Sequence, residues 1–206
     1  MGKVAVIDYG MGNLHSVGKA LEKVSQKKRV IVTSNVSEIN NAERLVLPGV
    51  GAIKDCMEAL SSKGLEEVVI KNSSRKPILA VCVGMQMLLE FSEENNGVNG
   101  LGILNGKVTK ISKEPNIKVP HMGWNQVQQI REHTIWNNIE DNSYFYFVHS
   151  YVCMESDFAI AKTEHGRKFV SAISKDNIFA VQFHPEKSQK TGLILYENFV
   201  NWKGEV

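Results

Sequence analysis

The sequence has few of the features that mark secreted, membrane-spanning or nucleic-acid-binding proteins. Only three of its 206 residues are cysteines, at Cys56, Cys82 and Cys153. Because this number is odd and no pair has the spacing of a metal site, we expect neither a disulfide framework nor a bound metal. No apolar run approaches the roughly 20 residues that a membrane-spanning helix needs. The 24 Lys and Arg residues nearly balance the 22 Asp and Glu residues, so no charge excess favours nucleic acid or an anionic membrane as a partner.

The amino-terminal residues have the apolar pattern of a strand, and no signal-peptide core follows them. We therefore expect a protein of a reducing compartment, the cytoplasm. The sequence also has no repeat of fixed period and no Pro/Ser-rich linker. Hydrophobic residues make up 43% of the chain, which is enough for one substantial core. We expect a single α/β domain over residues 1–206.

Short apolar runs alternate with amphipathic stretches of helix length through the first half of the chain. The expected strands cover Val4–Ile7, Arg29–Thr33, Arg44–Leu47 and Pro77–Val81. The expected helices cover Ser16–Val24, Asp55–Lys63 and Gly64–Lys71, and a further helix starts within Met85–Phe91. Strands that are apolar throughout and alternate with helices indicate a parallel sheet that is covered on both faces.

The second half of the chain has closely spaced runs that are typical of strands. These runs are Gly106–Ile111, Asn125–Ile130, Tyr144–Val152, Phe158–Thr163, Val170–Ser174 and Ile178–Gln182. Their short connections favour hairpins and a mixed sheet over further βαβ units. A last helix is expected over Gly192–Trp202.

Cys82 lies between an expected buried strand and an expected helix, two residues before Gly84. This is the pattern of a nucleophile elbow, a tight turn that exposes a nucleophile at the carboxyl edge of a sheet. The unpaired amides at the start of a helix also stabilise a thiolate. The alternative is that Cys82 is a small buried apolar residue, as many free cysteines are. Cys56 and Cys153 lack such a turn and are expected to be structural.

His184 is followed by Pro185, which disfavours the helical region for the residue before it and keeps His184 extended. Residues two apart in an extended chain point the same way, so His184 and Glu186 can share a face. A carboxylate in that place fixes the tautomer of the imidazole and stabilises its charged form. The alternative is a histidine at a strand end beside an unrelated surface glutamate.

Two glycine-rich turns follow expected strands. In the first, Gly10 and Gly12 half-match a dinucleotide fingerprint, but His15 replaces the third glycine and no acidic residue ends Arg29–Thr33. We therefore expect no NAD, and no other cofactor. The second turn, Pro48–Gly51, can direct backbone N–H groups at a developing oxyanion, or it is an ordinary strand-to-helix loop.

Several segments together resemble a known family. The cysteine elbow, the PGVG turn before it and the FHPE segment after it are similar to the class I (triad) glutamine amidotransferases. More narrowly, the chain resembles the glutaminase subunits of imidazole glycerol phosphate synthases, which act in histidine biosynthesis. The segments that carry this resemblance are IDYGMGN, LPGVGA, CVGMQ, VPHMGWN, YFVHSY and QFHPEKS. They extend from about Val4 to about Phe199.

The resemblance implies a flavodoxin-like three-layer sandwich with a mixed central sheet, and hydrolysis of L-glutamine to glutamate and ammonia. It implies that Cys82 is the nucleophile, that His184 transfers protons and that Glu186 orients His184. The N–H groups of Gly51 and Val83 would bind the oxyanion. The residues that would bind glutamine are Gly49, Gln86, Glu94, His149, Ser150 and Tyr151. Gln86 could instead be a solvent-facing helix residue, and His149 an ordinary strand-edge histidine.

The resemblance also implies a heterodimer, in which ammonia passes to a (β/α)₈-barrel cyclase that makes imidazole glycerol phosphate and an aminoimidazole carboxamide ribonucleotide. The positions that match the partner-facing ones are Asn13, Met122, Trp124 and Lys187. A buried indole at Trp124 and a solvated charge at Lys187 are the alternatives. Glutaminases of this subfamily also supply ammonia to amidotransferases that modify surface-polysaccharide sugars. A different class of hypothesis, a non-catalytic scaffold or cysteine-stress protein, leaves the FHPE segment unexplained.

Overall fold

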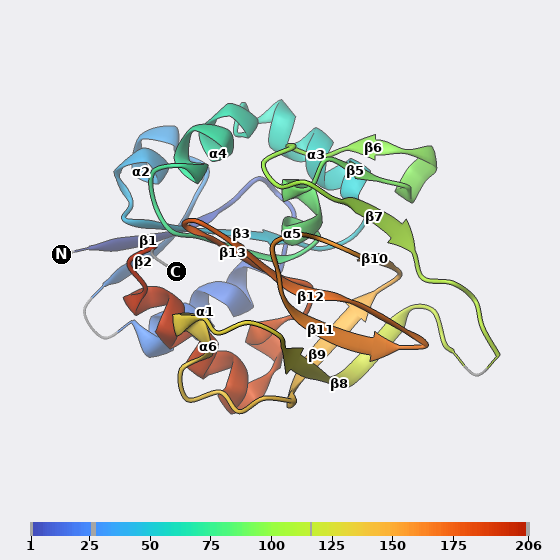
Figure 1. The fold of residues 1–206 in the computed structure, drawn as a ribbon. Coiled ribbons are helices and arrows are strands. Elements are labelled where there is room, and N and C mark those ends of the chain that lie inside the picture. The colour runs from blue at the N-terminus through green and yellow to red at the C-terminus, as the bar shows by residue number, and fades with distance from the viewer. Residues whose placement is uncertain (1, 26–27, 116, 205–206) are drawn as a thin grey trace.

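A computed structural model describes residues 2–25, 28–115 and 117–204, so the two ends of the expected domain lie outside the described residues. Its main sheet has the strand order β2-β1-β3-β4-β13-β12-β10-β7-β5-β6 (Figure 1). The parallel part consists of β2 (Arg29–Thr33), β1 (Lys3–Ile7), β3 (Arg44–Gly49), β4 (Ile78–Cys82) and β13 (Ile178–Val181). The first four of these strands confirm the alternating pattern of the first half.

The second half adds antiparallel strands, as its short connections predict. These are β12 (Arg167–Lys175), β10 (Tyr151–Cys153), β7 (Lys107–Lys110), β11 (Ala159–His165), β8 (His121–Gln129) and β9 (Ser143–His149). Two short strands, β5 (Phe91–Ser92) and β6 (Val98–Asn99), form the edge, and β5 runs parallel to β7. The sheet is therefore mixed.

Helices cover both faces of the parallel strands (Figure 1). On one face lie α1 (Leu14–Val24) and α6 (Gln189–Asn201), which pack against each other. On the other face lie α2 (Val36–Asn41), α3 (Ile53–Ser62) and α4 (Glu66–Ser73), and α5 (Val83–Leu88) packs against α3. The three-layer sandwich that the resemblance implies is confirmed. Three short turns of 3₁₀ helix are η1 (Glu94–Asn96), η2 (Thr134–Trp136) and η3 (Pro185–Lys187).

The core is centred on β3, β4 and β13, in which every residue is buried. Burial on both faces is what their continuous apolar sequences predict. β3 and β4 run in register so that Gly49 pairs with Cys82, and the next strand, β13, ends at Val181. The carboxyl ends of these three strands therefore meet at one edge of the sheet.

Three local expectations differ from the structure. Tyr144–Val152 is not one strand, because β9 pairs with β8 whereas β10 pairs with β7 and β12, and the chain changes partners at Ser150. The helix expected near Met85–Phe91 begins earlier, at Val83, and Phe91 is already in β5. The short helix α2 was not expected. Its N-cap Asn35 accepts a hydrogen bond from the Glu38 N–H at 3.1 Å, an Asn-x-x-Glu capping signal that the sequence does carry.

No helix among the described residues is long and apolar enough to cross a membrane.

Candidate active site

Cys82 is the last residue of β4, and α5 begins at the next residue. Its backbone has φ 56° and ψ −113°, a conformation that costs a non-glycine residue about 1–3 kcal/mol. The turn is packed closely against β3, because a Cβ on Gly84 would lie 2.1 Å from the carbonyl oxygen of Leu47. Only glycine fits there. The sharp strand-to-helix turn that the sequence predicts at Cys82 is confirmed.

His184 follows β13 and is extended, with φ −105° and ψ 96°, as its position before Pro185 predicts. Contrary to the expectation from the sequence, the chain does not stay extended to Glu186, because Pro185–Lys187 form the 3₁₀ turn η3. Its Nδ1 lies 2.8 Å from Glu186 Oε1, and the two side chains are 2% and 1% exposed. Tyr196 Oη donates to the other carboxylate oxygen at 3.4 Å. Within the described part of the chain His184 Nε2 is buried without a hydrogen-bond partner, so this nitrogen is available to exchange a proton with another group.

The charges around His184 favour its protonated form. Burial alone would lower the pKa of the ring, but the Cys82 thiolate and the Glu186 carboxylate outweigh burial and raise the pKa to about 10. The imidazolium is therefore stable beside a thiolate. By contrast, burial raises the pKa of the Cys56 thiol, and it raises that of Cys153 to about 11. These two thiols are poor nucleophiles at neutral pH.

Cys82 and His184 line one cavity of about 220 Å³. The other residues that line it are Val50, Gly51, Val83, Gln86, Glu94, Val148, His149, Ser150, Tyr151 and Lys187. The cavity thus brings together most of the residues singled out from the sequence for catalysis and glutamine binding. Glu186 lies behind His184. Gly49 is buried against α5 instead, where a Cβ would lie 2.6 Å from the Gly84 nitrogen.

The loop after β3 forms one wall of this cavity. The Cys56 thiol donates to the Val50 carbonyl at 3.3 Å, and Tyr9 Oη donates to the Pro48 carbonyl at 2.6 Å. Because a trans peptide directs its C=O and N–H to opposite sides, the Gly51 N–H points away from α3. Gly51 has φ +88°, a value that glycine adopts readily. The Val83 N–H, at the start of α5, has no partner within its own helix.

Two further polar side chains shape the cavity wall. Glu94 Oε2 accepts the backbone N–H of Ile53, at the start of α3, at 3.0 Å. Gln86 is only 3% exposed, so it is not a solvent-facing helix residue. Its Nε2 donates to the Tyr151 carbonyl at 3.1 Å and to Gln182 Oε1 at 2.9 Å. Gln182 was not singled out from the sequence. Its own Nε2 lies 3.7 Å from Cys82 Sγ.

His149 is held by a chain of hydrogen bonds. Its Nδ1 lies 3.0 Å from the Tyr151 carbonyl, and its Nε2 lies 2.9 Å from Nδ1 of His121. Because a carbonyl can only accept, Nδ1 of His149 carries the hydrogen and Nε2 accepts from His121. Burial lowers the pKa of His149 to about 3 and that of His121 to about 4. Both rings are neutral at pH 7, and His121 is a second residue that the sequence reasoning missed.

Three of the expected partner-facing residues lie close together beside the cavity. Met122 and Trp124 on β8 are 62% and 46% exposed. Trp124 packs edge-on against Tyr146, with 6.1 Å between ring centroids, and Lys187 Nζ lies 5.7 Å from the centroid of the same tyrosine ring. Trp124 is therefore not a buried indole. Asn13 is the N-cap residue of α1, a helix that contacts η3.

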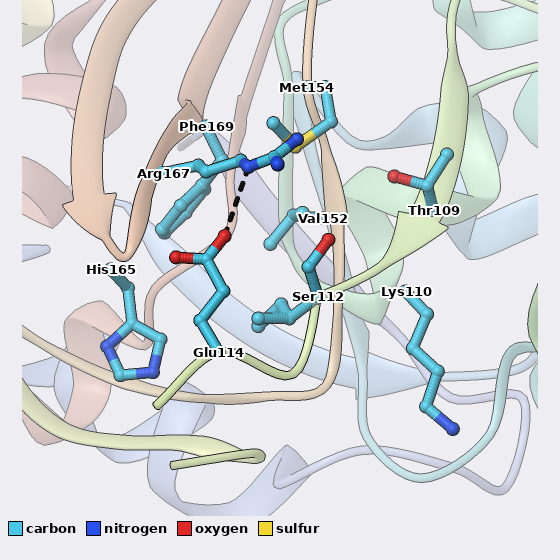
Figure 2. A pocket seen from close by; sticks show the side chains of 10 residues that line it. Thr109, Lys110, Ser112, Glu114, Val152, Met154, His165, Arg167 and Phe169 are labelled. Atoms are coloured by element: carbon cyan, nitrogen blue, oxygen red, sulfur yellow. Dashed lines mark hydrogen bonds and ion pairs between the residues drawn. The ribbon is translucent and has the colours of Figure 1, made fainter. Parts of the chain in front are cut away.

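A second cavity of about 220 Å³ lies between β7, β10 and β12 (Figure 2). Glu114 and Arg167 point toward each other in it and form an ion pair at 3.1 Å, and His165 lies at its edge. None of the residues that line it is a cysteine. This cavity therefore has no counterpart of the Cys82, His184 and Glu186 arrangement.

The whole chain is similar to proteins of one family. The family model of class-I glutamine amidotransferases matches residues 5–202. The imidazole glycerol phosphate synthase subunit HisH of Nitrosococcus oceani is 53% identical over 99% of this chain and 99% of its own length. The protein of the same name from Acinetobacter baylyi is 52% identical over 98% of this chain and 99% of its own length.

Solved structures share the fold at lower sequence identity. PurLQS from Thermotoga maritima superposes with a TM-score of 0.72 at 16% identity, covering 97% of this chain and 98% of that chain. A glutamine amidotransferase superposes with a TM-score of 0.73 at 14% identity, covering 97% and 99%. Because the family model spans nearly the whole chain and the full-length relatives share half of its residues, this chain belongs to the class-I glutamine amidotransferases.

Proposed function

We propose that this protein is the glutaminase subunit of an imidazole glycerol phosphate synthase, a single amidotransferase domain that acts in the cytoplasm. It hydrolyses L-glutamine to glutamate and ammonia, and the ammonia passes to a cyclase subunit. One observation carries the chemistry. The thiol of Cys82, presented by a strained turn, shares a cavity with His184, whose other ring nitrogen is bonded to Glu186.

The first half-reaction begins with attack of the Cys82 thiolate on the side-chain amide carbon of glutamine. The carbonyl oxygen becomes an oxyanion, and the N–H groups of Gly51 and Val83 stabilise it. The imidazolium of His184 donates its Nε2 proton to the amide nitrogen, and the C–N bond breaks. Ammonia leaves and a γ-glutamyl thioester remains on Cys82. The raised pKa of His184 supports this role, because a protonated ring can act as the acid.

The second half-reaction returns the enzyme to its starting state. His184 is now neutral and takes a proton from a water molecule, which attacks the thioester carbon. The C–S bond breaks, glutamate leaves, and the thiolate and imidazolium form again. Glu186 keeps Nδ1 of His184 protonated throughout, so that the proton is exchanged at Nε2.

Glutamine is held by other residues of the cavity wall. The donors of Gln86 are bonded within the protein, which leaves its Oε1 to accept from glutamine. Glu94 supplies a carboxylate for the ammonium group of glutamine, with one oxygen on the Ile53 N–H. The backbone of Ser150 and Tyr151 forms the remaining side, and neutral His149 holds the Tyr151 carbonyl in place.

The cyclase partner is a (β/α)₈ barrel, and it binds the outer face of the β8–β9 hairpin. Residues alternate along both strands, so Met122 and Trp124 point outward together with Tyr144, which is 55% exposed. Exposed aromatic and methionine side chains that lie together are typical of an interface. Asn13 and Lys187 contribute polar contacts at the rim of the cavity.

The test combines enzyme activity with growth. The chain is assayed for glutamate release alone and with the cyclase subunit, next to Cys82→Ala and, as a matched control, Cys153→Ala. Loss of turnover in the Cys82 variant alone is expected. The gene must also restore growth without histidine to a strain that lacks its glutaminase subunit. Turnover without complementation would instead point to an acceptor such as a surface-polysaccharide amidotransferase, and turnover in Cys82→Ala would overturn the mechanism.

A further inference from the structure

Gln182 is a fully buried polar residue at the end of β13. It precedes His184 by two residues, in the bend between β13 and η3. Its amide group contacts two other residues at the cavity. Oε1 accepts from Gln86 at 2.9 Å, and Nε2 lies 3.7 Å from the sulfur of Cys82.

The orientation of the Gln182 amide follows from its neighbours. The Tyr151 carbonyl has lone pairs and no hydrogen, so the group of Gln86 that lies 3.1 Å from it is the NH₂. The same NH₂ lies next to Gln182, and the oxygen of Gln182 must therefore face it. The NH₂ of Gln182 is left to face Cys82. The Tyr151 carbonyl thus fixes the orientation of the Gln86 amide, and the Gln86 amide fixes that of Gln182. As a result, an N–H group of Gln182 faces the sulfur.

We propose that Gln182 is a catalytic residue, whose Nε2–H donates a hydrogen bond to the Cys82 thiolate. The proposal deepens the proposed function, since it rests on Cys82 as the nucleophile. The bond favours the ionised sulfur before glutamine binds. It also orients the sulfur lone pairs during attack on the amide carbon.

A second polar contact of the sulfur favours the opposite state. The Val148 carbonyl lies 4.0 Å from Cys82 Sγ and can accept from a thiol, but it offers nothing to a thiolate. A buried anion without donors is costly, and a hydrogen bond to a charged group is roughly twice as strong as a neutral one. Gln182 is a neutral donor, so it stabilises the thiolate without competing for the proton that His184 transfers.

Other ionisable groups lie around the sulfur, around His184 or in the cavity wall. They are His184 and Glu186 after β13, Tyr9 after β1, Cys56 on α3, His149 on β9, and Glu94 and Lys187 in or beside the cavity. A variant must therefore change the contact at Gln182 without moving these groups. Gln182→Glu does this most closely, because one carboxylate oxygen can still accept from Gln86 and the other replaces the NH₂ that faces the sulfur.

The experiment measures the alkylation of Cys82 by iodoacetamide in the full chain as a function of pH. In Gln182→Glu we expect alkylation at pH 7 to be about tenfold slower or more. The pH of half-maximal alkylation should rise by about one unit. With the cyclase subunit present, kcat for glutamine should fall by a similar factor, whereas KM changes less. Asn41→Asp makes the same change from amide to carboxylate at an exposed position in α2 and should match the wild type.

Two further measurements keep the test decisive if Gln182→Glu does not fold. Gln182→Met removes the donor without adding charge and should slow alkylation in the same direction by a smaller factor. In the wild type, the side-chain amide NMR signal of Gln182 should titrate at the alkylation midpoint, and it should not titrate in Cys82→Ala. A folded Gln182→Glu that is alkylated with the wild-type rate and midpoint would overturn the proposal. If alkylation changes as expected but the wild type releases no glutamate with its partner, the proposed function fails and the thiolate contact stands.

Discussion

The most direct test of the His184 and Glu186 pair is the substitution Glu186→Gln. The amide has nearly the shape of the carboxylate, so Oε1 can still accept from His184 Nδ1, which now lies 2.8 Å away. The new NH₂ would face Tyr196 Oη, which lies 3.4 Å from the second oxygen and can accept from it. The geometry of His184 is therefore kept, and only the negative charge is lost.

The loss of charge sets the size of the effect. A hydrogen bond to a charged group contributes about 1.5–3 kcal/mol, against about 1 kcal/mol for a neutral one. The imidazolium in the transition state therefore loses about 0.5–2 kcal/mol, and kcat should fall roughly 2- to 30-fold. Removal of the proton-transferring group itself, in His184→Ala, should cost more, since general acid–base catalysis contributes about 10²- to 10⁴-fold.

A pH profile gives a second, independent result. Cys82 and Glu186 together hold the pKa of His184 at about 10, against burial. Without the carboxylate the pKa must fall, so the imidazolium is lost at a lower pH and the alkaline limb of kcat moves down, by roughly one unit. The assay is glutamate release by the chain with its cyclase subunit between pH 6 and 10, and a thermal melt controls for folding. An equal loss of kcat in both variants, or an alkaline limb that stays in place, would refute the orienting and charge-stabilising role of Glu186.

Three further predictions concern stability and assembly. Gly84→Ala should lower the unfolding temperature and the alkylation rate of the nucleophile together, because its Cβ would lie 2.1 Å from the Leu47 carbonyl oxygen, which belongs to the backbone of a buried strand. Between pH 6.5 and 4.5 the protein should lose stability, since burial holds the pKa of three histidines at about 3 to 4 and the unfolded chain binds protons first. These histidines are His121, His133 and His149. The variant His133→Asn keeps an acceptor for the cap of η2. In urea titrations it should reduce this loss of unfolding free energy by roughly 2 kcal/mol. An unchanged pH dependence would contradict the lowered pKa of His133. Trp124→Ala should weaken binding of the cyclase at least tenfold, as measured by calorimetry. Ile130 is also exposed but lies just past the end of β8, so Ile130→Ala should not weaken binding. Equal effects would argue against the outer face of β8 and β9 as the binding surface.

The spacing of apolar residues and the positions of proline and glycine predict most of the parallel half of the fold. Strands such as Ile78–Cys82 are apolar throughout and are bounded by a proline or a glycine turn, so length and composition identify them. Pairing between distant strands is a different matter. In the sequence, the residues of β9 and β10 have the pattern of one strand. They form two strands because β9 pairs with β8 whereas β10 pairs with β7, and the chain changes partners at Ser150.

Some residues of the candidate site could be predicted from the sequence, and others could not. Cys82 and His184 could be found because the strand-to-helix turn and the extended residue before Pro185 are local signals. The alternation of an extended chain predicts that Glu186 lies beside His184, but in the structure the 3₁₀ turn η3 places it there. Gln182 lies in a bend after β13, so its place beside Cys82 depends on tertiary structure and not on an alternation that the sequence carries. His121 could not be found in this manner. It reaches His149 only because the β8–β9 register pairs the two residues, and a register between distant strands is set by tertiary packing.

The residues that carry the chemistry are also the ones that work against stability. The backbone strain at Cys82 and the burial of the Gln182, His184 and Glu186 side chains would each destabilise an isolated turn or strand end. They are tolerated because fully buried strands surround them and because, within the described residues, each polar atom of these three side chains but one has a hydrogen-bond partner. The exception is Nε2 of His184, which is unpartnered among the described residues. That one unsatisfied atom belongs to the group that must take and release a proton in both half-reactions, so its lack of a partner is what the proposed mechanism requires.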